Sequence, residues 1–139
     1  MKELSQEMKE FCEKQELMRL AYTDSRGYAR AVPVWYVIIE GDYYMGTYRN
    51  SEKWKSILQN PRVGWVIDAG QNPKYKGVSV YGNAEEITGK QAVLVYNELG
   101  KKYFGTTDDP AFKQIYGEVD SAQNGYLRLR PEGVFSWEY

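Results

Sequence analysis

The feature that most restricts the fold is a series of short, aromatic-rich runs separated by turn signals. "LMRLAYT" and "YARAVPVWYVII" flank the tetrapeptide Asp24-Ser25-Arg26-Gly27, and residues 40–42 join the second run to "YYMGTY". Such runs, with Gly and Asp between them, are typical of antiparallel hairpins. Aromatic residues make up 15% of the chain and fall mostly in these runs. The pattern favours a barrel or sandwich over a helical bundle.

Six strands are expected, and they suit a small barrel better than a flat open layer. Pro33 has no amide hydrogen, so its part of the second strand should lie at an edge, at a bulge or beside a ligand. We therefore predict one domain, residues 1–139, that is mainly β with flanking helices and forms a small antiparallel β-barrel of six strands, either closed or split. The expected strands cover residues 17–23, 28–39, 43–48, 62–68, 75–87 and 125–139, the last interrupted at 131–133.

Four helical segments are expected between these strands. Apolar residues recur at helical spacing over residues 3–15, and again for a turn or two after Ser51. Thr88 and Gln91 fit a capping box that opens a helix running to about residue 104. Asp109-Pro110 can begin a short helix that ends at residue 116.

Composition removes several classes of function. The chain has 18 Lys and Arg against 19 Asp and Glu, and this net charge of −1 gives no basic stripe for nucleic acid. It has no His, which removes the commonest general base and metal ligand, so no metal site is expected. Cys12 is the one cysteine and is predicted to be packed in a reducing compartment. No apolar run is long enough to span a membrane, so a cytoplasmic location is expected.

The stretch from Thr47 to Lys53 gathers hydroxyls and cations where a strand passes into a helix. Helix N-termini present free amide hydrogens and a partial positive charge, and they bind phosphate well. A Lys in the first turn is unfavourable there unless an anion is bound. The alternative is a solvated turn in which Ser51 acts only as a helix cap. Arg30 lies on an apolar strand face and either extends its charged end to solvent or points at an anion.

These segments, in this order, resemble the FMN-binding split barrels related to pyridoxamine 5′-phosphate oxidase, over about residues 17–137. "RAVPVWY" resembles the family's second strand. "YMGTYRNSEKWKSILQNPRVGWVID" resembles its third strand, phosphate turn, helix and fourth strand. "YKGVSVYGNAEEI" and "RPEGVFSWEY" resemble its fifth and closing strands.

The resemblance implies a six-stranded antiparallel split β-barrel. It also implies a homodimer that holds FMN at its interface and acts on a small-molecule substrate. Arg30, Thr47, Ser51 and Lys53 would contact the phosphate, with Thr47 also able to reach the ribityl chain. The backbone of Ala31, Val32 and Pro33 would follow the ring. Backbone near Gly77 and Val78 would help, and Trp137 would form a wall from the partner subunit. Chemistry would take place at the flavin N5, so no catalytic side chain is expected, and the expected activity is that of an oxidoreductase using a nicotinamide.

Three departures from the oxidase point to a relative rather than the vitamin-forming enzyme. Glu52 stands where the oxidase has a second phosphate-binding Arg, and Gly77 replaces a Gln that helps to bind flavin. The sequence runs only two residues beyond Trp137, where the oxidase continues into a substrate-binding segment. The alternative function is a non-catalytic or stress-response module that binds flavin, a deazaflavin coenzyme or haem. A barrel that binds single-stranded nucleic acid is disfavoured by the charge balance.

Overall fold

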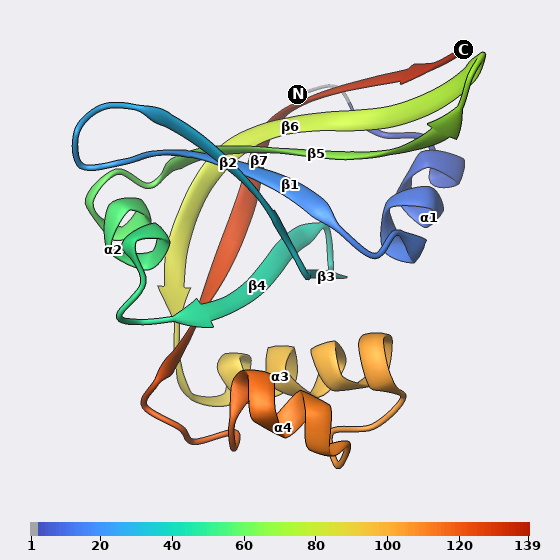
Figure 1. The fold of residues 1–139 in the computed structure, drawn as a ribbon. Helices are drawn as coiled ribbons and strands as arrows, with labels where there is room; N and C mark the ends of the chain where they lie inside the picture. The colour runs from blue at the N-terminus through green and yellow to red at the C-terminus, as the bar shows by residue number, and fades with distance from the viewer. Residues whose placement is uncertain (1–2) are drawn as a thin grey trace.

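The computed structural model describes residues 3–139, which form four helices and seven strands (Figure 1). Their bounds are α1 Gln6–Lys14, β1 Met18–Thr23, β2 Ala29–Val34, β3 Val37–Ile39, β4 Asp42–Tyr48, α2 Glu52–Gln59, β5 Arg62–Gln71, β6 Lys74–Ile87, α3 Gly89–Phe104, α4 Pro110–Tyr116 and β7 Asn124–Glu138.

All seven strands belong to one antiparallel sheet with the order β2-β1-β5-β6-β7-β4-β3. The two ends of this order, β2 and β3, are consecutive in the chain, so the two residues between them link the outermost strands of the sheet. This arrangement confirms the predicted split barrel. It also confirms Pro33 in an edge strand, because β2 pairs only with β1 among the described strands.

The prediction of six strands differs from the structure because the expected strand over residues 28–39 divides at Trp35 and Tyr36. The Tyr36 amide donates to the Tyr103 hydroxyl at 3.0 Å, and the Lys102 ammonium donates to the Tyr36 carbonyl, also at 3.0 Å. Both side chains come from α3. The backbone of Tyr36 is thus bonded to a helix rather than to a neighbouring strand, which lets the chain turn from one edge of the sheet to the other.

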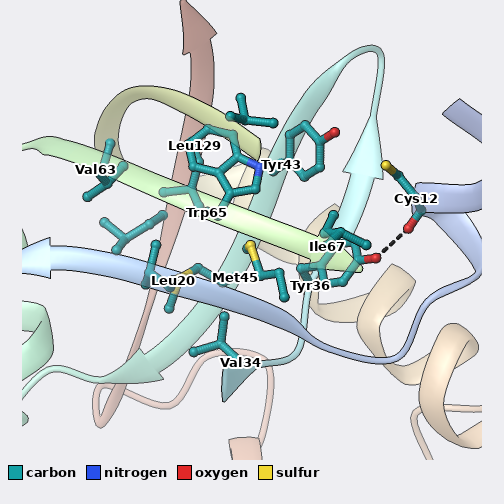
Figure 2. Close-up of a cluster of buried hydrophobic side chains, with 14 of the residues drawn as sticks. Cys12, Leu20, Val34, Tyr36, Tyr43, Met45, Val63, Trp65, Ile67 and Leu129 are labelled. Atoms are coloured by element: carbon teal, nitrogen blue, oxygen red, sulfur yellow. Dashed lines mark hydrogen bonds between the residues drawn. The ribbon is translucent and has the colours of Figure 1, made fainter. Parts of the chain in front are cut away.

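The main core lies inside the barrel and is closed at one end by α1 (Figure 2). Inward side chains of β1, β4 and β5 meet here, and Trp65, Met45 and Leu20 are almost completely buried. Cys12 of α1 is also fully buried, and the Tyr36 hydroxyl donates to its carbonyl oxygen. The thiol is therefore a packed core group, as the sequence predicts.

A second apolar cluster joins the barrel to the layer formed by α3 and α4. Tyr96 and Leu99 of α3 pack with Phe112 of α4 against Tyr44 and other residues of the sheet. These two helices lie together on one side of the barrel (Figure 1). The predicted helix up to about residue 104 is thus confirmed, with its apolar face against the sheet.

Three local predictions need correction. Thr88 precedes α3 but makes no side-chain hydrogen bond to its first turn, so the capping box is wrong. The final strand is continuous over Asn124–Glu138, because the expected break becomes a β-bulge opposite Tyr81 and Gly82. The connection between the strands expected at 62–68 and 75–87 is shorter than predicted, since β5 runs to Gln71 and β6 begins at Lys74.

Within residues 3–139, no helix combines the length and the apolar character needed to cross a lipid bilayer.

Candidate functional site

Ser51 lies between β4 and α2, directly before the first residue of the helix. Its hydroxyl oxygen accepts the Trp54 amide at 3.1 Å, and the hydroxyl donates to the Tyr48 carbonyl at 2.7 Å. These two bonds make Ser51 the N-cap and satisfy one of the free amides of the first turn. The Ser51 hydroxyl is therefore used by the chain itself.

Lys53 lies in the first turn of α2, and its side chain is half-buried. Burial lowers the pKa of its ammonium group, because removal from water disfavours the charged form. Among residues 3–139, no carboxylate forms an ion pair with it. A half-buried cation at the positive end of a helix, without a counter-charge, is the arrangement that an added anion would stabilise.

Arg30, on β2, is placed differently from Lys53. Its Nη1 lies 3.5 Å from Asp24 Oδ2 and 4.0 Å from Glu52 Oε2. The Asp24 carboxylate is buried and accepts the backbone amides of Arg26 and Tyr28, at 2.9 and 3.0 Å. The Arg30 guanidinium thus lies between two carboxylates, one of them held by its own turn.

The Glu52 side chain, at the start of α2, contacts residues of both β1 and β2. Its carboxylate accepts the Tyr22 hydroxyl and the Ser56 hydroxyl, each at 2.7 Å. The hydrogen bonds from Ser56 and Tyr22 lower the pKa of Glu52, because they stabilise the ionised carboxylate. Sequence analysis missed Tyr22 and Ser56. The spacing of Ser56 four residues after Glu52 was a usable signal, whereas Tyr22 lies 30 residues away and is found only through the fold.

Thr47 and Arg49 lie on the approach to α2. Thr47 is half-buried and pairs with Gly125 of β7. By strand alternation it shares the inward face of β4 with Met45. Arg49 binds the Glu86 carboxylate, and its guanidinium carbon lies 5.1 Å from the centre of the Trp54 ring. Arg49 is thus engaged with β6 and α2, so it is not free to complete the expected cationic cluster.

Ala31, Val32 and Pro33 lie on β2, whose second edge has no partner strand within residues 3–139. The Asp24 amide bonds the Tyr28 carbonyl, which fixes the alternation of the hairpin ladder. By this alternation the polar backbone atoms of Val32 point to β1, whereas those of Ala31 point to the open edge. Pro33 also faces that edge, where its missing amide hydrogen costs no ladder bond.

Gly77, Val78 and Trp137 lie far from the start of α2. Gly77 pairs with Trp137 on one side and Asp68 on the other, whereas Ala21, the neighbour of Tyr22 in β1, pairs with Gly64 of β5. Four residues along a strand correspond to about 14 Å. The Val78 side chain is completely buried in the core. A Cβ atom on Gly77 would lie 2.4 Å from the Trp137 ring, so this ring covers the glycine.

We call the residues around the start of α2 the α2 junction, namely Tyr22, Asp24, Arg30, Ser51, Glu52, Lys53 and Ser56. The structure brings together Arg30, Ser51 and Lys53 there, with Thr47 on the strand that leads in. It leaves Gly77, Val78 and Trp137 at the other end of the sheet. The junction combines the cations Arg30 and Lys53, the carboxylates Asp24 and Glu52, and the hydroxyl groups of Tyr22, Ser51 and Ser56.

One hollow in the surface lies beside the α2 junction, and another lies away from it. One, of about 360 Å³, lies on the outside of the sheet and is lined by Tyr22, Ala29 and Tyr81 among others. It adjoins the junction through Tyr22. The other, of about 340 Å³, lies beside α1 and is lined by Leu4, Ile38 and Tyr43 among others. It contains none of the predicted site residues.

The sheet order and the polar junction at the start of α2 define a small split-barrel protein. The sequence profile described as pyridoxamine 5′-phosphate oxidase matches residues 4–138. The chain therefore belongs to the pyridoxamine 5′-phosphate oxidase family. No protein with a curated function matches the sequence.

Solved structures share this fold. A conserved hypothetical protein from Mycobacterium tuberculosis is 23% identical with a TM-score of 0.82, over 98% of this chain and 86% of that one. A haem storage protein from Vibrio cholerae is 18% identical with a TM-score of 0.76, over 96% and 94%. An FAD-binding protein from Mesorhizobium loti is 25% identical with a TM-score of 0.72, over 97% and 93%.

Proposed function

We propose that this protein binds FMN at the α2 junction and transfers hydride or electrons between a nicotinamide and a small organic acceptor. The observation that carries the proposal is the half-buried Lys53 ammonium in the first turn of α2, which has no carboxylate partner among residues 3–139. The open edge of β2 supports it, because the backbone of Ala31 is available to a planar ring. The FAD-binding relative shows that a similar chain takes a flavin.

The role of the chain is to hold and orient the flavin. Lys53 and the free amides of α2 receive the phosphate, and Thr47 donates its hydroxyl at the same end. The edge of β2 offers the Ala31 amide and carbonyl to the ring. The bound flavin would supply the redox chemistry, which needs no protein acid or base.

The direct test is a titration of the purified chain with FMN, followed by flavin fluorescence. Lys53→Glu should weaken FMN binding about 10- to 150-fold, which corresponds to the roughly 1.5–3 kcal/mol of a charged hydrogen bond. Lys55→Glu is the matched control, because Lys55 is an exposed lysine of the same helix. Equal affinity in wild type and Lys53→Glu, or no binding of FMN at all, would refute the proposal.

We further propose a homodimer formed through the outer side of the sheet, which we call the aromatic face: Gly77, Tyr81, Gly133, Phe135 and Trp137. Phe135 is 65% exposed and Tyr81 63% exposed, and the two lie on the paired strands β6 and β7, on one continuous face. Sedimentation should give a dimer, and Phe135→Lys should shift it towards monomer. Ile115→Lys, an exposed apolar position on α4, should leave the mass unchanged.

We also propose a cytoplasmic location. It is supported by the buried, unpaired thiol of Cys12, since free cysteines persist in reducing compartments. Localisation of a tagged chain by fractionation tests this point.

A non-catalytic module is the second candidate, and the haem storage relative supports it at the level of the fold. Reduction distinguishes the two: an oxidoreductase bleaches its bound flavin when NADH or NADPH is added without oxygen, whereas a storage protein does not. Parallel titrations with haem and with a deazaflavin coenzyme identify the other ligands. The absence of His from the chain removes the commonest haem ligand.

A further inference from the structure

The two cations of the α2 junction differ in how far their charge is already compensated. Arg30 lies within 3.5 Å of Asp24 and 4.0 Å of Glu52, while Lys53 forms no ion pair among residues 3–139. The Asp24 side chain is 3% exposed and is held by two backbone amides, so it does not leave Arg30 when a ligand arrives. An incoming anion therefore finds Lys53 free and Arg30 occupied.

Glu52 is fixed in this arrangement. The Tyr22 and Ser56 hydroxyls both donate to its carboxylate at 2.7 Å, from β1 and from the next turn of α2. Glu52 is also the first residue of α2, where a carboxylate offsets the partial positive charge of the helix end. The Glu52 carboxylate thus weakens the attraction of an anion both to the Arg30 guanidinium and to the N-terminus of α2.

The formal charges of the side chains in the α2 junction cancel. Arg30 and Lys53 contribute two positive charges, and Asp24 and Glu52 contribute two negative charges. What remains is the helix end, equivalent to about half a positive charge. A phosphate monoester near neutral pH carries about −1.5 to −2. A dianion would thus leave the junction with excess negative charge close to Glu52, whereas a polyol chain would not. A polyol can moreover donate hydrogen bonds to a carboxylate, which a phosphate dianion cannot do.

We propose that Glu52 determines ligand specificity by lowering the preference for phosphorylated flavins, so that the junction accepts an isoalloxazine with an uncharged polyol chain nearly as well as FMN. This inference rests on the proposed function and concerns the same site. Glu52 acts on the charged end of the ligand, and the ring site along β2 is unaffected.

The test compares FMN with riboflavin on the full chain, by fluorescence titration at one pH and one ionic strength. Wild type should bind the two flavins within about 10-fold of each other. Glu52→Gln keeps the shape of the side chain but removes the charge. Its carbonyl oxygen can accept one of the Tyr22 and Ser56 hydroxyls, and its NH2 group can donate to the other. It should tighten FMN binding about 5- to 30-fold at low salt and leave riboflavin within about 2-fold.

Two further variants separate charge from structure. Tyr22→Phe removes one hydrogen bond but keeps the Glu52 carboxylate, so the ratio of the two affinities should stay at the wild-type value. Glu98→Gln removes a carboxylate from α3, away from the junction, and should change neither affinity. Thermal melts show which variants are folded, and the wild-type ratio remains informative if Glu52→Gln is not.

The outcomes are distinct. A wild-type preference for FMN of 100-fold or more, or a ratio that Glu52→Gln leaves unchanged, overturns the role of Glu52 while the proposed FMN site stands. Failure of wild type to bind either flavin overturns the proposed function and this inference together.

Discussion

A tryptophan lies against a glycine at each end of the sheet, but the two contacts differ in exposure. Near the α2 junction, Trp54 of α2 covers Gly125 of β7 and is 3% exposed. At the other end, Trp137 of β7 covers Gly77 of β6 and is only half-buried, beside the exposed Phe135. Both glycines make room for a ring, because a Cβ atom would lie within 2.4 Å of it.

The difference in exposure shows that Trp54 serves the packing of the fold, whereas Trp137 is accessible to a partner. Trp54 is sealed between α2 and the sheet, and it fixes the helix whose first turn carries Lys53. Trp137 has one side against Gly77 and leaves much of its surface uncovered. The contact between Trp54 and Gly125 therefore stabilises the fold. The contact between Trp137 and Gly77 is part of the surface that we propose binds a second copy of the chain.

The largest effect is expected from Trp54→Ala. Removing a buried aromatic side chain leaves a cavity, and the free energy of unfolding should fall by about 3–5 kcal/mol. Urea denaturation measures this loss. Leu58→Ala is the matched control on the same helix, because Leu58 is 47% exposed and should change stability by less than about 0.5 kcal/mol. A loss at Trp54 as small as that at Leu58 would show that the contact is not sealed.

A smaller loss is expected from Gly125→Ala, which adds one methyl group beneath Trp54. The added Cβ would lie 2.2 Å from the ring, and the ring cannot retreat because the core surrounds it. Overpacking of this kind should cost about 1–3 kcal/mol in the free energy of unfolding. An unchanged urea midpoint would mean that α2 can move outward without loss.

Gly77→Ala makes the same change at the open end, and we expect less than about 1 kcal/mol of destabilisation. The added Cβ would press on the Trp137 ring at 2.4 Å, but this ring is partly exposed and can turn away. Its displacement would reshape the aromatic face, so the dimer should weaken more than the fold does. Sedimentation over a range of concentrations, beside Gly125→Ala at the same loadings, checks this distinction.

The sequence predicted best those features that depend on neighbouring residues. The turn after Asp24 and the start of α4 at Asp109 each follow from side chains one to four residues away, and the structure confirms both. For Ser51 the sequence left a helix cap and a ligand contact open, and the structure shows the cap. The pattern of strands indicated a barrel, and the family resemblance indicated its split form. Local chemistry and the pattern of apolar runs were thus sufficient for most of the fold.

The features that sequence analysis missed depend on contacts across the fold. The division at Tyr36 is caused by Lys102 and Tyr103, more than 60 residues later. Arg30 is compensated by Asp24 and also by Glu52, which reaches it because α2 begins beside β2. Arg49 turns to Glu86 for the same kind of reason. In each case a charged or polar side chain had several possible partners, and the tertiary arrangement selected one.

An effect that depends on pH is expected at Cys12, which tests how well the core excludes solvent. Burial raises the pKa of its thiol from 9.0 to about 11, so the folded state holds this proton more tightly than the unfolded state. The contribution to stability is complete below pH 9 and is lost as pH rises towards 11. The difference in unfolding free energy between wild type and Cys12→Ala should therefore shrink over that range. At pH 8, alkylation of the thiol should proceed at the rate of unfolding. Rapid alkylation of the folded chain would show instead that α1 opens independently of the barrel.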